Sequence, residues 1–497
     1  MSDQSTPAKT WFGHPGGLST LFFTELWERF SYYGMRALLV LFMVKAVEEG
    51  GMGIDDKTAS AIYGLYTAFV YLAALPGGWI ADRLIGAQRA VWVGGLIIAA
   101  GHFTLAIPST PTFFLGLILV VIGTGFLKPN ISAIVGQLYP EGGARRDAGF
   151  SIFYMGINLG AFFGPLVCSA LGEKVDWHLG FGAAGVGMVL GVIQYKLSAP
   201  RLGEAGLYPS KPEGADEGGG LDKAWYPVIG GFAVIGLVVI LCIVGVLTLN
   251  AVALAEYTKY VLVLIAFAFF VYVFVFGNLT RTERNHTIVI VVLFISSALF
   301  WSGFEQAGSS LNLFADRHTD RGVFGWEIPA GWFQSLNPFY IVVLAPIFAT
   351  FWVRLAKKQM DPSMPAKFAF GLIILGLGFL VMVGAAKLVV AGNQAAPYWL
   401  ILTYLLHTMG ELCLSPVGLS SVTKLAPQRF VGQMMGIWFL ATSLGNLMAG
   451  LLAGRFNPEA LNEMPGLFMQ IVMTTVGGGI ILLIFTKPIK KLIGKIE

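Results

Sequence analysis

Residues 123–140 read GTGFLKPNISAIVGQLYP, and residues 410–427 read GELCLSPVGLSSVTKLAP. The two stretches align without a gap and share six of 18 residues. Two prolines are among the shared residues, at the seventh and the last position of each stretch. Each stretch lies in the fourth long apolar segment of a set of six. The repeat therefore predicts a chain built from two related six-helix halves in parallel orientation.

The composition is typical of a membrane protein. Of 497 residues, 56% are hydrophobic and only 12% are charged, whereas an ordinary soluble domain is about 25% charged. A soluble enzyme, a nucleic-acid binder and a disordered protein are therefore excluded. The three cysteines lie apart in apolar runs, which predicts neither a disulfide framework nor a metal site. The first apolar segment contains Glu25, Glu28 and Arg29, which the core of a cleavable signal would not carry.

The number of membrane spans follows from the length of the apolar segments, because a helix needs about 20 mostly apolar residues to cross the hydrocarbon. We predict an all-α polytopic membrane protein with fourteen transmembrane helices. The predicted spans are residues 19–47, 58–82, 89–107, 112–138, 148–171, 179–199, 224–250, 258–279, 286–315, 328–354, 366–391, 397–424, 431–454 and 465–486.

The distribution of the basic residues predicts the orientation. With fourteen spans both termini lie on one side, and 21 of the 32 lysines and arginines then fall on that side. Eight fall on the opposite side and three lie within spans. Because cytoplasmic loops carry the excess of basic residues, both termini are predicted to be cytoplasmic.

The spans divide into two sets of six with an insertion between them. Residues 200–222 are rich in proline, glycine and charge, which predicts a cytoplasmic linker. The predicted domains are an N-terminal six-helix bundle at 1–199, the linker at 200–222, an inserted two-helix hairpin at 223–280, and a C-terminal six-helix bundle at 281–497. The hairpin offers no charge to a cavity and is interpreted as a lipid-facing structural insertion.

Charged residues within the first span indicate a functional site. The segment ELWERFSYYGMR starts at Glu25, and its Glu25, Glu28, Arg29, Tyr32 and Arg36 share an arc of about 100° on a helix. A charge at the centre of a bilayer costs about 2.5–3.5 kcal/mol, so this face cannot point to lipid. These residues either line a cavity or form a buried ion-pair network that only fixes helix packing.

Other polar residues within the spans also need partners. Lys128, just before Pro129, requires a counter-charge, for which Glu25 or Glu28 is the natural candidate. Three pairs lie one turn apart on one helix face: Tyr154 with Asn158, Trp301 with Glu305, and Glu411 with Ser415. By position alone, Trp438 is more typical of helix packing than of a pocket. Asp82 indicates a gate or hinge, and Asp316 a solvated rim.

These residues resemble the motifs of a known family. ELWERFSYYG is similar to the ExxERFxYYG motif of the proton-dependent oligopeptide transporters, a branch of the major facilitator superfamily. GFLKPN, FSIFYMGINLGAFFGP, FEQAGSSLNLF and SLNPFYI resemble that family's fourth-, fifth-, seventh- and eighth-span segments. The resemblance covers nearly the whole chain. It implies a major facilitator fold of two six-helix bundles, with the extra hairpin found in bacterial members and the substrate site between the halves.

The resemblance also implies roles for individual residues. Proton coupling is implied for Glu25, Glu28, Arg29, Lys128 and Glu305. The substrate-binding set is Tyr32, Tyr33, Arg36, Tyr71, Lys128, Asn158, Trp301, Asn337, Glu411, Ser415 and Trp438. In this set Arg36 and Lys128 would face the peptide carboxylate, and Glu411 with Ser415 the amino group. Arg36 and Asp316 could pair as an outer gate. One departure is visible: the second span has no histidine, so a proton step assigned to one in animal members must be carried by the carboxylates.

The predicted cargo is a di- or tripeptide, with the proton as coupling ion and no cofactor. Arg36 and Lys128 are cations on the side of the first half, and Glu411 is an acid on the side of the second half. This arrangement matches the dipole of a free peptide, which has an ammonium group and a carboxylate. The same fold carrying nitrate, an amino acid or a drug remains the alternative. A membrane-embedded enzyme such as an acyltransferase would need a nucleophile with its base or a metal cluster, and none is found. We expect a multi-pass protein of the bacterial inner membrane, with no nucleic acid and no obligate protein partner.

Overall fold

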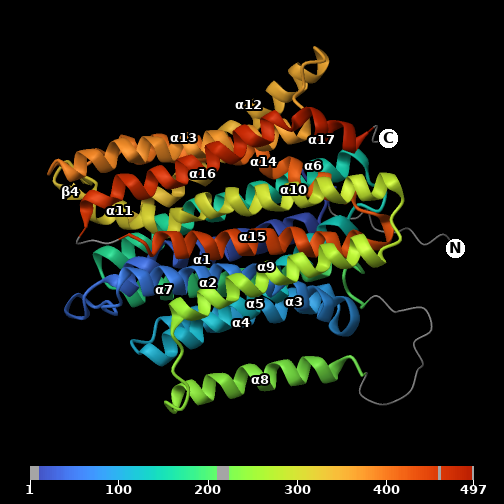
Figure 1. Ribbon diagram of the computed structural model, residues 1–497. Helices are drawn as coiled ribbons and strands as arrows, with labels where there is room; N and C mark the ends of the chain where they lie inside the picture. The colour runs from blue at the N-terminus through green and yellow to red at the C-terminus, as the bar shows by residue number, and fades with distance from the viewer. Residues whose placement is uncertain (1–9, 210–222, 457–459, 495–497) are drawn as a thin grey trace. The chain divides into compact units, whose positions relative to one another are not determined.

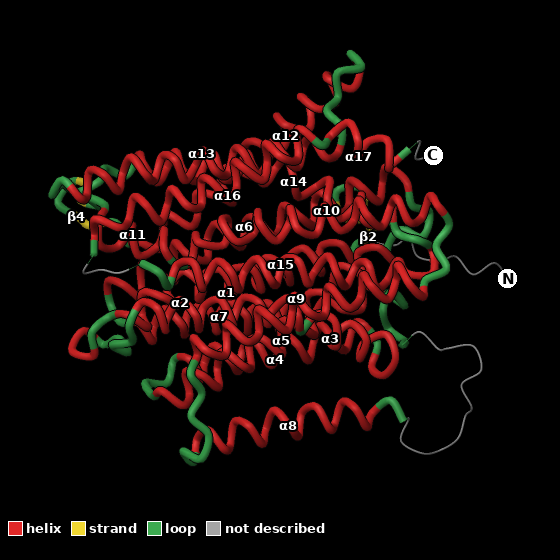
Figure 2. Tube along the Cα trace, in the orientation of Figure 1, coloured by secondary structure: helices red, strands yellow, loops and turns green. Residues whose placement is uncertain are grey.

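The computed structural model describes residues 10–209, 223–456 and 460–494, and helices make up most of them (Figures 1 and 2). The helices are α1 (Gly17–Val44), α2 (Asp56–Leu72), α3 (Ala74–Ile80), α4 (Ala87–Leu105), α5 (Thr110–Gln137), α6 (Gly143–Lys174), α7 (Trp177–Ser198), α8 (Trp225–Ile243), α9 (Ala251–Phe276), α10 (Arg281–Phe304), α11 (Ser310–His318), α12 (Leu336–Lys357), α13 (Met364–Val390), α14 (Tyr398–Leu425), α15 (Val431–Ala453), α16 (Met464–Ile484) and α17 (Thr486–Ile493). Two short antiparallel hairpins join β1 (Thr10–Trp11) to β2 (His14–Pro15) and β3 (Gly322–Val323) to β4 (Trp326–Glu327).

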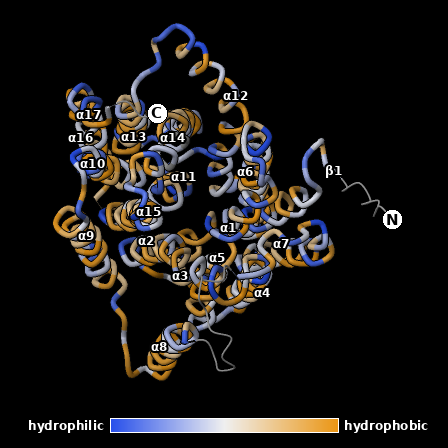
Figure 3. The backbone as a smooth tube through the Cα atoms, turned by 90° about the vertical axis from the view of Figure 1, so that its right-hand side faces the viewer, coloured by the Kyte–Doolittle hydropathy of each residue, from blue (hydrophilic) through white to orange (hydrophobic). Residues whose placement is uncertain are grey.

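The predicted all-α membrane architecture is confirmed. Twelve helical stretches of the described chain are long and apolar enough to cross a membrane. The two other predicted spans form α1 and α4, of 28 and 19 residues. Figure 3 shows that hydrophobic residues predominate along the helices, whereas hydrophilic residues gather in the connecting loops. Residues 210–222 of the predicted linker lie outside the described residues.

Breaks in the α-helical ladder interrupt the predicted spans 58–82 and 286–315. The span 58–82 divides into α2, α3 and a π-helical turn at Ala81–Ile85. Pro76 has no N–H to donate to the carbonyl of Leu72, so the α-helical ladder breaks between α2 and α3. The predicted span 286–315 passes through a 3-10 turn, Glu305–Gly308, between α10 and α11.

Tyrosines hydrogen-bond to the backbone of this 3-10 turn. The hydroxyl of Tyr63, on α2, donates to the carbonyl of Glu305 at 3.4 Å. The hydroxyl of Tyr404, on α14, donates to the carbonyl of Ala307 at 3.3 Å. A backbone carbonyl without a partner is costly inside a membrane, so these two tyrosines help to stabilise the interruption next to Glu305.

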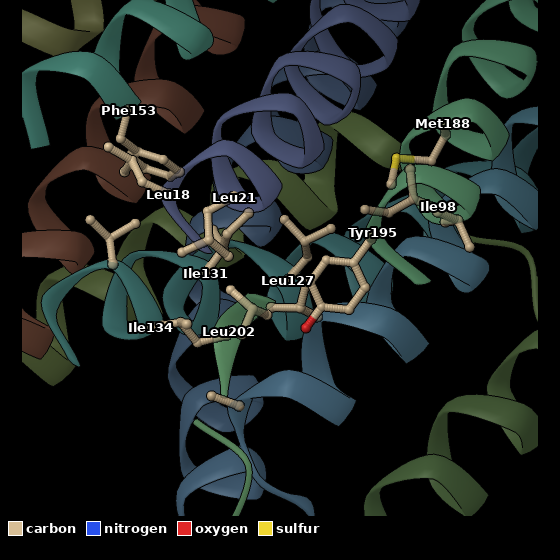
Figure 4. Close-up of a cluster of buried hydrophobic side chains, with 14 of the residues drawn as sticks. Leu18, Leu21, Ile98, Leu127, Ile131, Ile134, Phe153, Met188, Tyr195 and Leu202 are labelled. Atoms are coloured by element: carbon tan, nitrogen blue, oxygen red, sulfur yellow. The ribbon is translucent and has the colours of Figure 1, made fainter. Parts of the chain in front are cut away.

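By their contacts, the residues group into two compact units: residues 1–38 with 72–250, and residues 39–71 with 251–497. The first unit contains a core of buried apolar side chains from α1, α4, α5, α6 and α7 (Figure 4). Leu18, Leu21, Leu127, Ile131 and Tyr195 are members of this core. The second unit is organised around α13, which packs on α14, α16 and α10. The division into two bundles at 1–199 and 281–497 stays a prediction.

Glycines on α6 set the distance between this helix and α1. Gly156, Gly160 and Gly164 recur every fourth residue, so they share one side of the helix. A Cβ on Gly160 would lie 2.1 Å from the carbonyl oxygen of Leu26, and one on Gly164 would lie 2.4 Å from that of Phe30. Only a hydrogen at these positions lets the two backbones approach this closely.

We expect Gly160→Ala to destabilise the protein, although alanine is the better helix former by about 1 kcal/mol. The added methyl group overlaps the carbonyl of Leu26, and overpacking of this kind typically costs about 1–3 kcal/mol. Thermal unfolding of the purified protein in detergent measures the effect. Gly230→Ala on α8 is the matched control, because a Cβ there meets no atom within 4 Å. Equal melting temperatures for the two variants would contradict the close packing of α1 on α6.

Candidate functional site

The predicted charged face of α1 forms a compact ion-paired cluster. The Nε atom of Arg29 lies 3.0 Å from Oε1 of Glu25 and 2.5 Å from Oε2 of Glu28. The three residues are 4%, 3% and 0% exposed, respectively. One guanidinium group therefore serves two buried carboxylates. Because a buried charge left without its partner is strongly destabilising, loss of any one of the three side chains should destabilise the cluster.

Two tyrosines continue this face toward Arg36. The Cζ atom of Arg29 lies 5.3 Å from the ring centroid of Tyr32, and that of Arg36 lies 5.4 Å from the ring of Tyr33. The two rings meet edge to face at 5.2 Å. Both guanidinium groups are buried and lie at cation–π distance from a ring. The arrangement places two cations and two phenol groups along about two turns of helix.

Lys128 and Asn158 lie on neighbouring elements of the same unit. Lys128 is half-buried on α5 and precedes Pro129, which interrupts the backbone ladder within that helix. Asn158 is buried on α6, and its Nδ2 donates to the carbonyl of Tyr154 at 2.9 Å. Tyr154, by contrast, is exposed. Predicted site residues on α1, α5 and α6 thus belong to the first unit, whereas Tyr71 belongs to the second.

Glu411 on α14 is held by an asparagine from α12. The Nδ2 atom of Asn337 donates to Oε2 of Glu411 at 2.9 Å and to Oγ1 of Thr408 at 3.1 Å. Ser415 follows one turn after Glu411 and is half-buried. Sequence reasoning named Asn337, Glu411 and Ser415 but missed Thr408. The available signal was spacing, since Thr408 precedes Glu411 by three residues and so lies on the same helix face.

Aromatic side chains pack around Trp301, which the sequence paired with Glu305. Trp301 packs edge to face against Phe300 and Phe304, with ring centroids 5.5 and 5.3 Å away. Its Nε1 is buried and donates to no residue within the described part of the chain. Glu305 follows one turn later on the 3-10 turn and is 4% exposed. A buried indole donor and a buried carboxyl group thus lie one turn apart on this segment.

The remaining predicted residues have other neighbours. Trp438 packs on Phe368 at 6.2 Å and lies against the backbone of Gly418. Asp316 pairs with Arg321 at 3.1 Å, and Arg321 also pairs with Glu327 at 2.9 Å. Arg321 therefore ties the end of α11 to the β3–β4 hairpin. Asp82 is exposed on the π-helical turn, and its role in a gate or hinge stays a prediction. The predicted outer gate between Arg36 and Asp316 also stays a prediction.

An ion pair that the sequence did not reveal lies at the N-terminus of α2. Arg317 donates from Nη1 and Nη2 to the two carboxylate oxygens of Asp56, at 2.6 and 2.8 Å. Asp56 is at the start of α2 and Arg317 is in the last turn of α11, so each charge complements its own helix dipole. The preceding residue, Asp55, accepts the backbone N–H of Thr58 at 2.9 Å, and this hydrogen bond lowers the pKa of the Asp55 carboxyl.

A metal site is not formed by the residues that the structure describes, among which no three His, Cys, Asp or Glu side chains cluster suitably. The two units supply charged and polar side chains. The first unit supplies Arg29, Arg36 and Lys128 with two carboxylates, and the second supplies Glu305 and Glu411. Such groups can bind ions or zwitterions and can exchange protons.

Comparisons with known proteins agree over the whole chain. A family model described as POT family matches residues 88–465. The sequence is 44% identical to the peptide transporter YePEPT of Yersinia enterocolitica, covering 100% of this chain and 99% of that protein. It is 37% identical to the di-/tripeptide transporter of Lactococcus lactis subsp. cremoris, with 100% of both covered. A crystal structure of a mutant of the peptide transporter POT in complex with alafosfalin aligns with a TM-score of 0.89 and 43% identity, covering 99% of this chain and 98% of that one.

Proposed function

The chain belongs to the POT family, and from this we propose that it is a proton-coupled symporter that imports di- and tripeptides by alternating access. It is a transporter and not an enzyme. The observation that carries the proposal is the full-length similarity to proteins named peptide and di-/tripeptide transporters. The buried charges of the two units support it, because a free peptide needs both cationic and anionic partners.

The peptide's two termini would be bound by groups of opposite charge. Arg36 and Lys128 would bind the carboxylate, and Glu411 with Asn337 would bind the ammonium group. The hydrogen bond from Asn337 to Glu411 supports this role, because it holds the carboxylate group in a defined position. The tyrosines, the tryptophans, Asn158 and Ser415 would line the pocket with few groups that select one side chain over another.

The proton would act through the charge balance of the α1 cluster. Glu25 and Glu28 carry two negative charges, and Arg29 and Lys128 carry two positive ones. A proton on Glu28 leaves a net positive charge, which favours binding of a peptide carboxylate. Protonation would also weaken the ion pair with Arg29, so proton binding and conformation are linked. Glu305 is proposed as a second proton site, on the 3-10 turn that interrupts the predicted span 286–315.

Gating is proposed at the two ends of the protein. An outer pair between Arg36 and Asp316 would require Asp316 to give up its ion pair with Arg321. Asp82, exposed on its π-helical turn, is proposed as part of an inner gate. Both termini are proposed to lie on the cytoplasmic side of a bacterial inner membrane, which the excess of basic residues supports. Peptides, protons and the lipid bilayer are the proposed partners, with no cofactor and no obligate protein partner.

Uptake of a labelled dipeptide into proteoliposomes tests the proposed function. We expect accumulation when the outside is more acidic than the inside, and its loss when a protonophore collapses the gradient. A free tripeptide should compete, whereas nitrate should not, because nitrate has no group for Glu411. Equal uptake with and without the gradient would exclude proton coupling, and an absence of peptide uptake would exclude the proposed cargo.

Removal of the inserted hairpin is expected to leave the peptide affinity within about twofold, as for distant sites that share no partner. No residue of α8 is buried. Five residues of α9 are buried, and this helix packs on α15 within the second unit. Helix α9 begins at Ala251, seven residues before the predicted start, where Glu256 and Lys259 form an ion pair. The measurement is the inhibition constant of a dipeptide for a protein in which a flexible linker joins residue 222 to residue 281. Stability should fall because the contacts of α9 are lost. A large loss of affinity in a well-folded deletion would show that the hairpin is more than a structural insertion.

A further inference from the structure

Thr408, which carries no role in the transport scheme above, is connected to the proposed amino-terminal site by two hydrogen bonds. It is fully buried on α14. Its hydroxyl donates to the carbonyl of Tyr404, one turn earlier on the helix, at 2.7 Å. Its oxygen accepts from Nδ2 of Asn337, on α12, at 3.1 Å. Both contacts lie within the second unit.

These bonds determine which way the Asn337 amide faces. A hydroxyl has one proton, and the proton of Thr408 is committed to the Tyr404 carbonyl. Toward α12 the Thr408 oxygen can therefore only accept. Asn337 must present its NH2 group there, and the second hydrogen of that group serves Glu411 at 2.9 Å. A reversed amide would place its oxygen against the Thr408 lone pair and the Glu411 carboxylate, which is unfavourable.

The consequence is a free acceptor beside Glu411. Both donors of the Asn337 amide are used, and its carbonyl oxygen accepts no hydrogen bond from any residue in the described ranges. Asn337 is half-buried, so this oxygen is not sealed off. An ammonium group has three donors and no acceptor. It can bond to Glu411 and the Asn337 oxygen together, whereas a reversed amide would direct hydrogens at the cation.

We propose that Thr408 is a positioning residue that fixes the Asn337 amide so that its oxygen, together with Glu411, accepts hydrogen bonds from the substrate's ammonium group. The role rests on the proposed function. It makes recognition of the amino terminus depend on a hydroxyl that does not contact the substrate. The four groups then form one oriented hydrogen-bond network, which runs from the Tyr404 carbonyl through the Thr408 hydroxyl and the Asn337 amide to the Glu411 carboxylate.

The test compares a dipeptide with its N-acetylated form. The ratio of their inhibition constants measures how strongly the protein prefers a peptide with a free amino group. Thr408→Val keeps the shape of the side chain but removes the acceptor, and it is expected to reduce the ratio about 3- to 10-fold, as for the loss of one hydrogen bond. Thr408→Ser restores the hydroxyl and should restore the ratio.

Thr403→Val is the matched control. Thr403 is equally buried on α14 and donates to the carbonyls of Trp399 and Gly378, away from Asn337. This variant should leave the ratio unchanged. A second test uses Asn337→Ala: if Thr408 acts through Asn337, Thr408→Val should have no further effect on the ratio in that background. Thr408→Ala serves as a second variant should Thr408→Val fail to fold.

The possible failures can be told apart. An unmodified protein that takes up no dipeptide overturns the proposed function and this role with it. A protein that prefers free to acetylated peptides, but whose ratio is unchanged in folded Thr408→Val or Thr408→Ala, overturns the role of Thr408 alone. Equal effects of Thr408→Val with and without Asn337 also overturn it, because the hydroxyl would then act by another route.

Discussion

Glu28→Gln is expected to abolish uptake driven by a proton gradient. Glu28 is fully buried, and its carboxylate contacts the guanidinium of Arg29 at 2.5 Å. Glutamine has nearly the same shape but can neither ionise nor take up the proton. Arg29 keeps only Glu25, at 3.0 Å, so the cluster becomes permanently more positive. We expect accumulation of peptide to fall to the level of empty liposomes, while exchange at equal pH survives.

Two further substitutions test the same cluster. Arg29→Ala and Lys128→Ala each remove a cation from beside the carboxylates, and leaving a buried charge unpaired costs about 3–5 kcal/mol. Both should abolish gradient-driven uptake, with lower stability for Arg29→Ala. Glu141→Gln is the control, because Glu141 forms an exposed pair with Arg145 at 3.4 Å, and pairs of that kind contribute about 0–1 kcal/mol. Normal acid-driven uptake by Glu28→Gln would end the assignment of this residue to coupling.

Glu411→Gln is expected to weaken the binding of free peptides about 10- to 150-fold. A charge-assisted hydrogen bond to the peptide ammonium contributes about 1.5–3 kcal/mol, which corresponds to that range. Glutamine at 411 still has an oxygen that can accept from Asn337, so the local geometry is kept and the charge is lost. N-acetylated dipeptides have no ammonium group, and their already weak binding should change little.

Inhibition constants for one dipeptide and its acetyl form, on both proteins, measure the effect. The ratio of the two constants should be large for the unmodified protein and much smaller for Glu411→Gln. Glu463→Gln, at an exposed position of the second unit, should leave the ratio as it was. A ratio that Glu411→Gln does not alter would mean that this residue does not read the amino terminus. The main physical argument for a peptide over other cargo would then be lost.

The membrane architecture and the charged face of α1 were predictable from the sequence. A span needs about 20 apolar residues with all backbone groups bonded within the helix, so composition and length locate it. The 3.6-residue period then places Glu25, Glu28 and Arg29 on one face, and lipid cannot solvate them. The structure confirms that the three are buried together and ion-paired. The family followed from the motifs that surround these residues.

Contacts between helices were decided only by the tertiary structure. Helical periodicity says which residues share a face, but not which residue of another helix meets them. The contact of Thr408 with Asn337, for example, exists only because α12 packs beside α14. The ion pair of Asp316 with Arg321 likewise depends on the folded structure. The 3-10 turn at Glu305–Gly308 likewise receives hydroxyls from Tyr63 and Tyr404, which are distant in sequence. Such pairings depend on packing distances of a few ångströms, which a one-dimensional pattern does not contain.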